Sequence, residues 1–337
     1  MDNFRIHRDP ESIASLKLVW DKLLGETRHV SFTQSWNWFQ MAARLWEKDF
    51  QPVVIEARFS ETTLGLLPLL SDLRHHCWIS PQSLLGFGHA APVGRSTTAT
   101  WITAARLLRD SLNKSMQWDL GPFPHGTGSS TRVTTVFNQL AVPALSNSHL
   151  ELPFVELDRD SSLFSGRESF EPARQGWRVL FGGTDDSLEQ GDSEALLSRF
   201  ATLVDRQDSP LGTLGRTRFL TSSDFEFLMT AFFDRGWIHL LMDEEYGGCV
   251  ILGDRDESYL LTFGFRLLPE PDRLIAIQDV LGMMRQKGFE NTTLLGSDPI
   301  LSQPFSQRQK QHSYRFVARK TPQTTLRHLW NRLTTAG

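Results

Sequence analysis

The order of helical and extended segments along the chain occurs twice, and this repetition limits the folds that the chain can adopt. A short strand, two amphipathic helices, three strands, a helix and a closing strand are predicted over residues 3–121 and again over 178–295. Corresponding elements begin about 175 to 190 residues apart, as at Thr97 and Asp272. The pattern favours two α/β units over one large sheet, with chance agreement between ordinary α/β elements as the alternative.

Hydrophobic periodicity, turn residues and prolines set the expected bounds of these elements. In the first copy, Thr33 is the expected N-cap of the second helix. Helices are predicted there over 11–24, 36–46 and 97–112, and strands over 3–7, 53–59, 64–70, 83–87 and 117–121. In the second copy, helices are predicted over 193–205, 223–235 and 272–287, and strands over 178–181, 237–242, 249–252, 259–265 and 291–295.

Pro143, the serines near 147 and Pro153 predict a domain boundary near residue 150. Residues 1–150 are therefore expected to form a first lobe and residues 151–337 a second lobe. The second lobe begins with an acidic, glycine-containing loop and ends in a basic tail that has no acidic residue from Pro299 onward. This tail is either a solvated basic face or a surface for an anionic ligand, such as the phosphates of CoA, or for an acidic partner.

Composition excludes several classes of protein. Of the 337 residues, 40% are hydrophobic, which is enough to fill two cores without metals or disulfides. The two cysteines, Cys77 and Cys249, have no zinc-type spacing. The net charge of −4 gives no global attraction to nucleic acid, so no DNA partner is expected. Without a signal-peptide pattern or a run of about 18 apolar residues, a soluble cytoplasmic protein with no membrane span is expected.

Several short segments occur in the order found in one group of transferases. Residues 32–38 (FTQSWNW) resemble a Phe-x-Gln-Ser-x-x-Trp helix start, and 64–69 (LGLLPL) a Gly-x-x-Pro-Leu strand. Residues 259–265 and 294–298 follow in the same order in the second half. The chain thus resembles tandem-lobe acetyltransferases of the GNAT superfamily associated with bacterial polysaccharide and cellulose synthesis, and the related Fem transferases. It departs from them at 300–301, where Ile-Leu replaces a frequent Tyr-Lys pair.

The resemblance implies two tandem GNAT-like lobes, each a mixed sheet flanked by helices. It also implies acyl transfer from acetyl-CoA or another acyl-CoA, without a metal, to an amine or hydroxyl of a small molecule, amino sugar or envelope precursor. One alternative is a catalytically degenerate binding protein of polysaccharide or envelope assembly, which the lost Tyr-Lys pair and the acidic loop favour. Another is a Fem-like transferase that uses aminoacyl-tRNA, which the net negative charge weakens.

Direct attack of an amine on a thioester needs a base and a proton donor for the leaving thiolate. Tyr259, at the start of a predicted strand, is either that donor or a packing residue. Asp298 either orients or deprotonates the amine, or serves as a turn or cap residue before Pro299. Glu244 and Glu245, in a predicted hairpin turn, are expected to be solvated charges.

Phosphate binding requires open backbone N–H groups ahead of a helix. Gly86, Gly88 and Gly94 lie between a predicted strand and the helix at 97, so they either form a pyrophosphate loop or satisfy turns. Arg266 either contacts an anion of the donor or forms a surface salt bridge.

Overall fold

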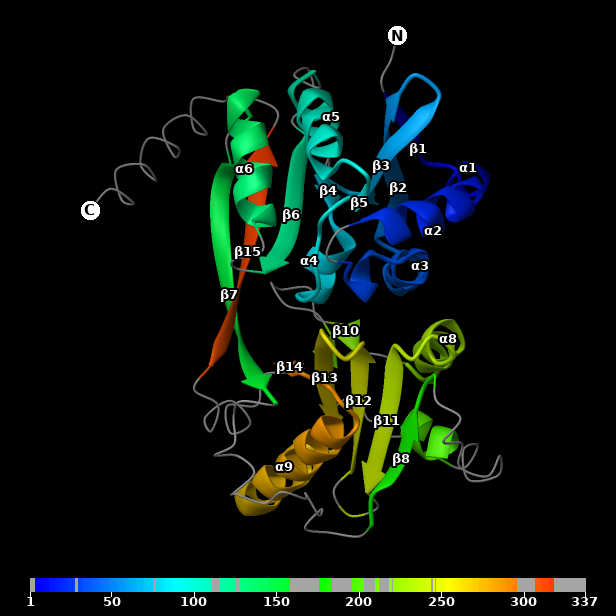
Figure 1. Cartoon of the computed structure of the whole chain (residues 1–337), viewed down its shortest axis with the longest axis vertical. Helices are drawn as coiled ribbons and strands as arrows, with labels where there is room; N and C mark the ends of the chain where they lie inside the picture. The colour runs from blue at the N-terminus through cyan, green and yellow to red at the C-terminus, as the bar shows by residue number, and fades with distance from the viewer. Residues whose placement is uncertain are drawn as a thin grey trace, which may run out of the picture. The chain divides into compact units, whose positions relative to one another are not determined.

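The chain folds into two compact units (Figure 1). The structure is a computed structural model, and it describes residues 4–27, 30–75, 77–110, 116–124, 128–142, 144–157, 176–183, 196–202, 210–211, 218–219, 221–243, 245, 247–295 and 307–317. Unit 1 contains the chain up to Leu150 and again from Lys310, and unit 2 contains most of the chain between Glu151 and Gln309. The described residues from Lys310 to Val317 thus group with unit 1, and the two lobes expected over 1–150 and 151–337 stay a prediction.

Unit 1 is built on a sheet in which one pair of strands is parallel. β4 and β6 run parallel, and the other registered neighbours are antiparallel. β7 (Ala144–Glu156), which enters unit 2 at Glu151, follows β15 in the strand order. The strand order of the unit is β1 (Phe4–His7), β2 (Phe50–Phe59), β3 (Thr62–Asp72), β4 (Cys77–Ile79), β6 (Gln117–Pro124) and β15 (Arg308–Val317), and the short β5 (Val93–Gly94) pairs with β3.

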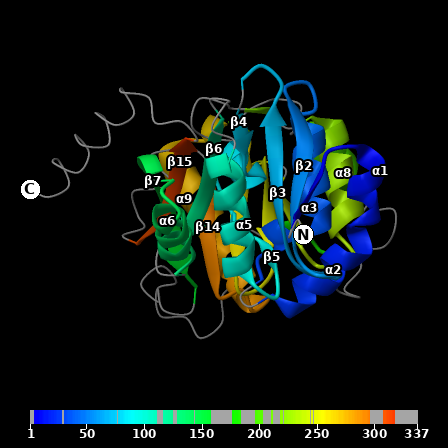
Figure 2. The same cartoon turned by 90° about the horizontal axis from the view of Figure 1, so that it is seen from above.

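Helices cover the sheet of unit 1 (Figure 2). α5 (Thr97–Asp110) and α6 (Ser129–Gln139) bury Trp101 and Phe137 against Trp78, Trp118 and Phe316 of the sheet. α1 (Pro10–Ser15), α2 (Lys17–Glu26) and α3 (Trp36–Leu45) pack over β2 and β3. Because side chains alternate along a strand, residues one position away from Trp78, Trp118 and Phe316 point away from α5 and α6.

Unit 2 has the same kind of sheet. β13 and β14 are parallel, and the other neighbours are antiparallel. α9 (Glu270–Gln286) connects β13 to β14 and covers one face. On the other face, Phe225 of α8 (Ser222–Phe232) stacks on Phe200, and Phe200 contacts Phe263 of β13. The strand order is β7, β14 (Asn291–Leu295), β13 (Ser258–Phe263), β12 (Gly247–Gly253), β11 (Ile238–Asp243) and β8 (Arg178–Phe181), and β9 (Pro210–Leu211) and β10 (Arg218–Phe219) form a separate ribbon.

Both units contain the sequence of elements that the repeat predicts. In each, three antiparallel strands lead through a helix to a strand parallel to the third, which needs a crossover connection. The predicted fold class, two α/β lobes that each have a mixed sheet flanked by helices, is therefore confirmed. None of the helices in the described ranges is long and apolar enough to cross a membrane.

Two local predictions in unit 1 are wrong. Residues 83–87 are not a strand, because Pro81 at the first helical position and left-handed Gly86 bound the short helix α4 (Pro81–Leu85) instead. Thr33 is not the N-cap of α3. It lies in a 3₁₀ turn, η1 (Phe32–Gln34), and Ser35 caps α3 by accepting the Trp38 N–H at 3.2 Å.

Candidate functional site

Each unit has one pair of parallel strands in a sheet whose other registered pairs are antiparallel. These pairs are β4–β6 in unit 1 and β13–β14 in unit 2. In open α/β sheets, ligands bind outside the carboxyl ends of strands at such changes of direction. The carboxyl ends of β4–β6 and of β13–β14 are therefore the two candidate ligand sites.

In unit 1, serine side chains close this end of the sheet. Ser80, which follows β4 directly, accepts the Gly121 N–H at 3.0 Å and lies 2.6 Å from the Gly121 carbonyl oxygen. Ser83 Oγ donates to the same carbonyl at 2.7 Å and lies 2.8 Å from Ser80 Oγ. α4 begins immediately after Ser80. The backbone N–H and carbonyl of Gly121 in β6 are thus bonded to serine side chains of the same chain. A ligand that used these backbone groups would have to displace the serines.

The glycines singled out from the sequence lie on the connection from β4 to α5. Gly86 ends α4 and donates its N–H to the Gln82 carbonyl at 2.8 Å. Gly94 donates to Thr27 Oγ1 at 2.9 Å, and a Cβ there would lie 2.5 Å from the Leu64 carbonyl oxygen. A Cβ on Gly88 would lie 2.7 Å from Thr33 Cγ2. Close packing therefore explains these glycines, and a phosphate-binding role stays a prediction.

Tyr259 lies at the amino end of β13, opposite Thr293 of β14. Its side chain is fully buried, and its hydroxyl donates to Glu257 Oε1 at 2.6 Å. Four residues of strand, about 13 Å, separate its backbone from Phe263 at the carboxyl end. The phenol is therefore engaged within the core of unit 2, and its role as a proton donor stays a prediction.

The other predicted site residues are placed less completely. Asp298 and Glu244 lie outside the described residues. The backbone of Arg266 lies in the 3₁₀ turn η3 (Phe265–Leu267) just after β13, and its side chain lies outside the described part. Glu245 is exposed in the hairpin between β11 and β12. Arg266 and this hairpin are thus brought to the same end of the sheet, whereas the three glycines belong to unit 1.

The carboxyl end of β13 lies beside the start of β12. Leu261 pairs with Leu295, the last described residue of β14, and Thr262 and Phe263 pair with Cys249 and Gly248 of β12. Gly264, at φ 82°, then turns the chain. A Cβ on Gly247 would clash with the Phe263 carbonyl oxygen, so the β11–β12 hairpin packs directly against this strand end.

Asp243 is a buried carboxylate at this end of unit 2 that sequence patterns do not distinguish. It ends β11, its residue is 4% exposed, and its Oδ1 accepts the Glu245 N–H at 2.9 Å. A Cβ on Gly176 would lie 2.5 Å from its Oδ2. Because Asp243 pairs with Gly247, which touches the end of β13, one strand separates its carboxylate from the carboxyl end of β13.

The start of α9 is unsuited to phosphate. Its first turn carries Glu270 and Asp272, and Pro269 and Pro271 remove two backbone N–H donors. Carboxylates at a helix N-terminus interact favourably with the macrodipole and occupy the place of an anionic ligand. A donor phosphate at unit 2 would therefore depend on other groups.

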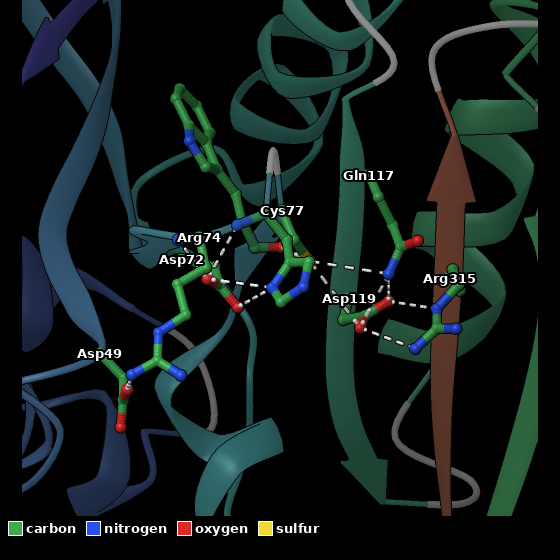
Figure 3. A network of polar contacts seen from close by, with 9 residues as sticks. Asp49, Asp72, Arg74, Cys77, Gln117, Asp119 and Arg315 are labelled. Carbon is green, nitrogen blue, oxygen red and sulfur yellow. Dashed lines mark hydrogen bonds and ion pairs between the residues drawn. The ribbon is translucent and has the colours of Figure 1, made fainter.

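A second polar network lies on the sheet of unit 1, on the face turned away from α5 and α6 (Figure 3). Arg315 donates to both carboxylate oxygens of Asp119, at 2.8 and 3.0 Å, and Gln117 Nε2 lies 3.3 Å from each. Cys77 Sγ lies 3.6 Å from the Gln117 amide nitrogen and 3.9 Å from Asp119 Oδ2. The network connects β4, β6 and β15 side by side.

This network does not activate a nucleophile. The pKa of the Cys77 thiol is raised to about 12, chiefly by burial. The negative charge of Asp119 contributes to this rise, and it outweighs the opposite effect of Arg315. The thiol therefore stays protonated at neutral pH, and the thiolate is the nucleophilic form of cysteine. Nearby, Asp72 accepts the N–H groups of Arg74 and His75 at 2.8 and 3.0 Å and closes the turn that follows β3. The arrangement is that of a structural network.

Comparison with known proteins gives similarity of structure only. No protein-family model matches the sequence, and no curated protein matches it. Similar solved structures include FemX, at 11% identity over 87% of this chain and 89% of that chain, with a TM-score of 0.48. A tandem GNAT protein from the clavulanic acid biosynthesis pathway is 13% identical over 94% and 98%, with a TM-score of 0.45. L-PGS from Bacillus licheniformis is 10% identical over 95% and 96%, with a TM-score of 0.45.

Proposed function

We propose that the chain is an acyltransferase that takes its acyl group from an acyl-CoA, and that transfer occurs in unit 2 at the carboxyl ends of β13 and β14. The observation that carries this proposal is the buried carboxylate of Asp243 at the carboxyl end of the parallel pair β13–β14, one strand away from β13. In open α/β sheets, ligands bind outside the carboxyl ends of strands at such a change of direction. A backbone N–H at this end of the sheet can stabilise the thioester oxyanion.

Asp243 is the proposed base. An alkylammonium with a pKa near ~10 must lose a proton before its nitrogen can attack. β11 lies two strand spacings, about 10 Å, from β13, so Asp243 would take this proton through a water molecule or from an acceptor bound over the hairpin. The nitrogen then attacks the thioester carbon, the C–S bond breaks, and the amide and CoA leave. A thiolate is a good leaving group because thiol pKa values are about 8.5, so a buried proton donor is not required.

Unit 2 is favoured over unit 1 because the equivalent end of unit 1 is filled. Ser80 and Ser83 bond to both backbone groups of Gly121, and α4 follows immediately. The proposal therefore assigns one donor site to each chain. The acceptor class, an amine or hydroxyl of a small molecule, amino sugar or envelope precursor, rests on the sequence resemblance, as does the choice of acetyl-CoA.

Calorimetric titration of the full chain with acetyl-CoA and with CoA tests the donor. We expect one saturable site for each chain. Release of free CoA is then followed on a panel of amino sugars and diamines, for the wild type and for Asp243→Asn, which should keep donor binding and lose about 10²-fold or more in kcat. Asp256→Asn is the matched control, because it removes the same charge from the β12–β13 turn at the other end of the sheet. Absence of acetyl-CoA binding would contradict the proposal. An equal loss of kcat in Asp243→Asn and Asp256→Asn would contradict it as well.

A further inference from the structure

A chain of hydrogen bonds joins a serine, a histidine and a glutamate in unit 1, away from the sheet ends described above. Ser12 Oγ lies 2.6 Å from His7 Nδ1, and His7 Nε2 lies 3.0 Å from Glu56 Oε2. The three residues come from α1, β1 and β2. A nucleophile within hydrogen-bond reach of a base that a third group orients is the arrangement that activates serine for covalent catalysis.

The glutamate determines which nitrogen of His7 carries the proton. An ionised carboxylate can only accept hydrogen bonds, so Nε2 must carry the hydrogen that it donates to Glu56. Nδ1 is then left with a lone pair, and the Ser12 hydroxyl donates to it. The imidazole is thus in the tautomer that a general base needs, with the lone pair of Nδ1 directed at the Ser12 hydroxyl.

Neighbouring groups hold the three side chains in this order. Thr63 Oγ1 donates to Glu56 Oε1 at 2.6 Å, and Arg58 Nε lies 3.6 Å from the same oxygen. The Ser12 N–H donates to Asp9 Oδ1 at 2.7 Å, which fixes the backbone of the serine. Exposure increases along the hydrogen-bonded series from Glu56 to Ser12, because the Glu56 residue is 5% exposed and Ser12 is half-buried. The acid is therefore inside and the hydroxyl is toward solvent.

We propose that Ser12 is a nucleophilic serine that accepts acyl groups from activated esters or thioesters. Its oxygen attacks the acyl carbon while its proton passes to His7 Nδ1. The bond from the carbon to the leaving oxygen or sulfur breaks, and His7 returns the proton to the leaving group. An acyl-serine and a free alcohol or thiol result, and water hydrolyses the ester by the same route. Asp9 and Glu11 carry carboxylates beside Ser12, so a small uncharged acyl group is the substrate class that fits.

Ser15 provides an internal comparison on the same helix. Its hydroxyl donates to the Ser12 carbonyl oxygen at 2.7 Å, as helical serines commonly do, and its bond to a backbone acceptor supplies no base. The two serines differ by three residues and in their hydrogen-bond partners. Any difference in reactivity between them therefore reports on His7 and Glu56.

Treatment of the full-length protein with p-nitrophenyl acetate, followed by peptide mass spectrometry, tests the proposal. We expect acetylation of Ser12 to be at least about tenfold faster than that of Ser15. Ser12→Ala should lose the label and Ser15→Ala should keep it. His7→Gln should slow labelling by about 10²-fold or more. Equal labelling of the two serines in the folded wild type would overturn the proposal without recourse to any variant.

Glu56 acts through His7, so its test needs a readout of the imidazole. In the wild type, ¹⁵N NMR should show His7 protonated on Nε2 and not on Nδ1. In Glu56→Gln, we expect labelling to slow by about tenfold or more and the preference for this tautomer to weaken, with a circular dichroism spectrum like that of the wild type. A wild-type His7 protonated on Nδ1 would exclude it as the base, and a Glu56→Gln variant with unchanged tautomer and labelling rate would remove Glu56 from the proposal.

Discussion

Arg315 forms a two-pronged ion pair with Asp119, which precedes it in the chain by 196 residues. The pair connects β15, the last described strand, to β6 in the sheet of unit 1, where Arg315 and Asp119 are also register partners. On the opposite face of β15, Phe316 is fully buried and its ring lies 4.1 Å from that of Phe137. The sheet of unit 1 is therefore completed by chain that follows unit 2.

A double-mutant cycle with Asp119→Asn and Arg315→Gln should give a coupling free energy of about 1 kcal/mol in urea unfolding. The value is modest because the Arg315 side chain is 47% exposed and solvent screens the pair. The cycle with Asp110→Asn and Arg109→Gln is the control, since that pair joins adjacent residues and the Asp110 side chain is 65% exposed, so the coupling should be near zero. Equal coupling in the two cycles would show that the geometry of the Asp119 pair adds nothing.

β15 also illustrates where sequence patterns fail in this chain. Arg308, Lys310 and Arg315 make the segment resemble a basic tail, and its partner strand, β6, is nearly two hundred residues away. Strands with strong local signals are predictable. β14 is an example, because apolar residues at helical spacing mark α9 before it and Gly288 marks the end of that helix. Pairing with distant strands leaves a weaker local signal. Pro153 likewise indicates a boundary, yet it lies inside β7.

The candidate site divides in the same way. The parallel pair β13–β14 follows from the repeated order of elements, which is encoded locally. Asp243 does not, because an aspartate ahead of two glutamates in a hairpin has the pattern of a solvated turn. In the structure Asp243 is buried beside Gly176, 67 positions earlier in the numbering, and pairs with Gly247, which packs against the end of β13.

Cys77 should resist alkylation in the folded protein. With a pKa of about 12, its thiolate fraction at pH 8 is about 10³-fold below that of an ordinary thiol. Iodoacetamide labelling followed by mass spectrometry should therefore be slow in buffer and fast in urea. The unfolded thiol loses its proton near pH 8.5 and the folded thiol does not, so this group favours the folded state below that pH and the advantage declines as the pH rises further. Rapid labelling without denaturant would contradict the placement of Cys77.

His239 should make the protein less stable in mild acid. Burial lowers its pKa to about 4, although the carbonyls of Gly236 and Gly253 oppose the shift, and its Nδ1 accepts the Gly182 N–H at 3.1 Å. Between about pH 6.5 and 4 the unfolded chain binds a proton that the folded chain does not, so stability falls as the pH falls through this window. The loss should be on the order of 2–3 kcal/mol. Urea unfolding at pH 7 and pH 4.5 measures it, and His239→Gln should lose most of this pH dependence.

Tyr259→Phe should separate packing from catalysis. The variant keeps the buried ring but leaves Glu257 without the hydroxyl that donates to it at 2.6 Å, which should cost about 1.5–3 kcal/mol in urea unfolding. Because this hydroxyl is engaged at the amino end of β13, we expect kcat for acyl transfer to stay within about threefold of the wild type. A fall in kcat of about 10²-fold with unchanged KM would instead establish Tyr259 as the proton donor.

Ser80→Ala tests whether unit 1 is closed to a donor. The substitution removes the hydroxyl that accepts the Gly121 N–H at 3.0 Å, and loss of an acceptor from a buried donor costs about 1–3 kcal/mol. Ser83→Ala is the control and should cost less, because the Gly121 carbonyl keeps Ser80 as a donor. Acetyl-CoA should still bind at one site for each chain in both variants, since α4 continues to cover the end of β4. A second site in Ser80→Ala would mean that a single hydroxyl is what keeps the donor out of unit 1.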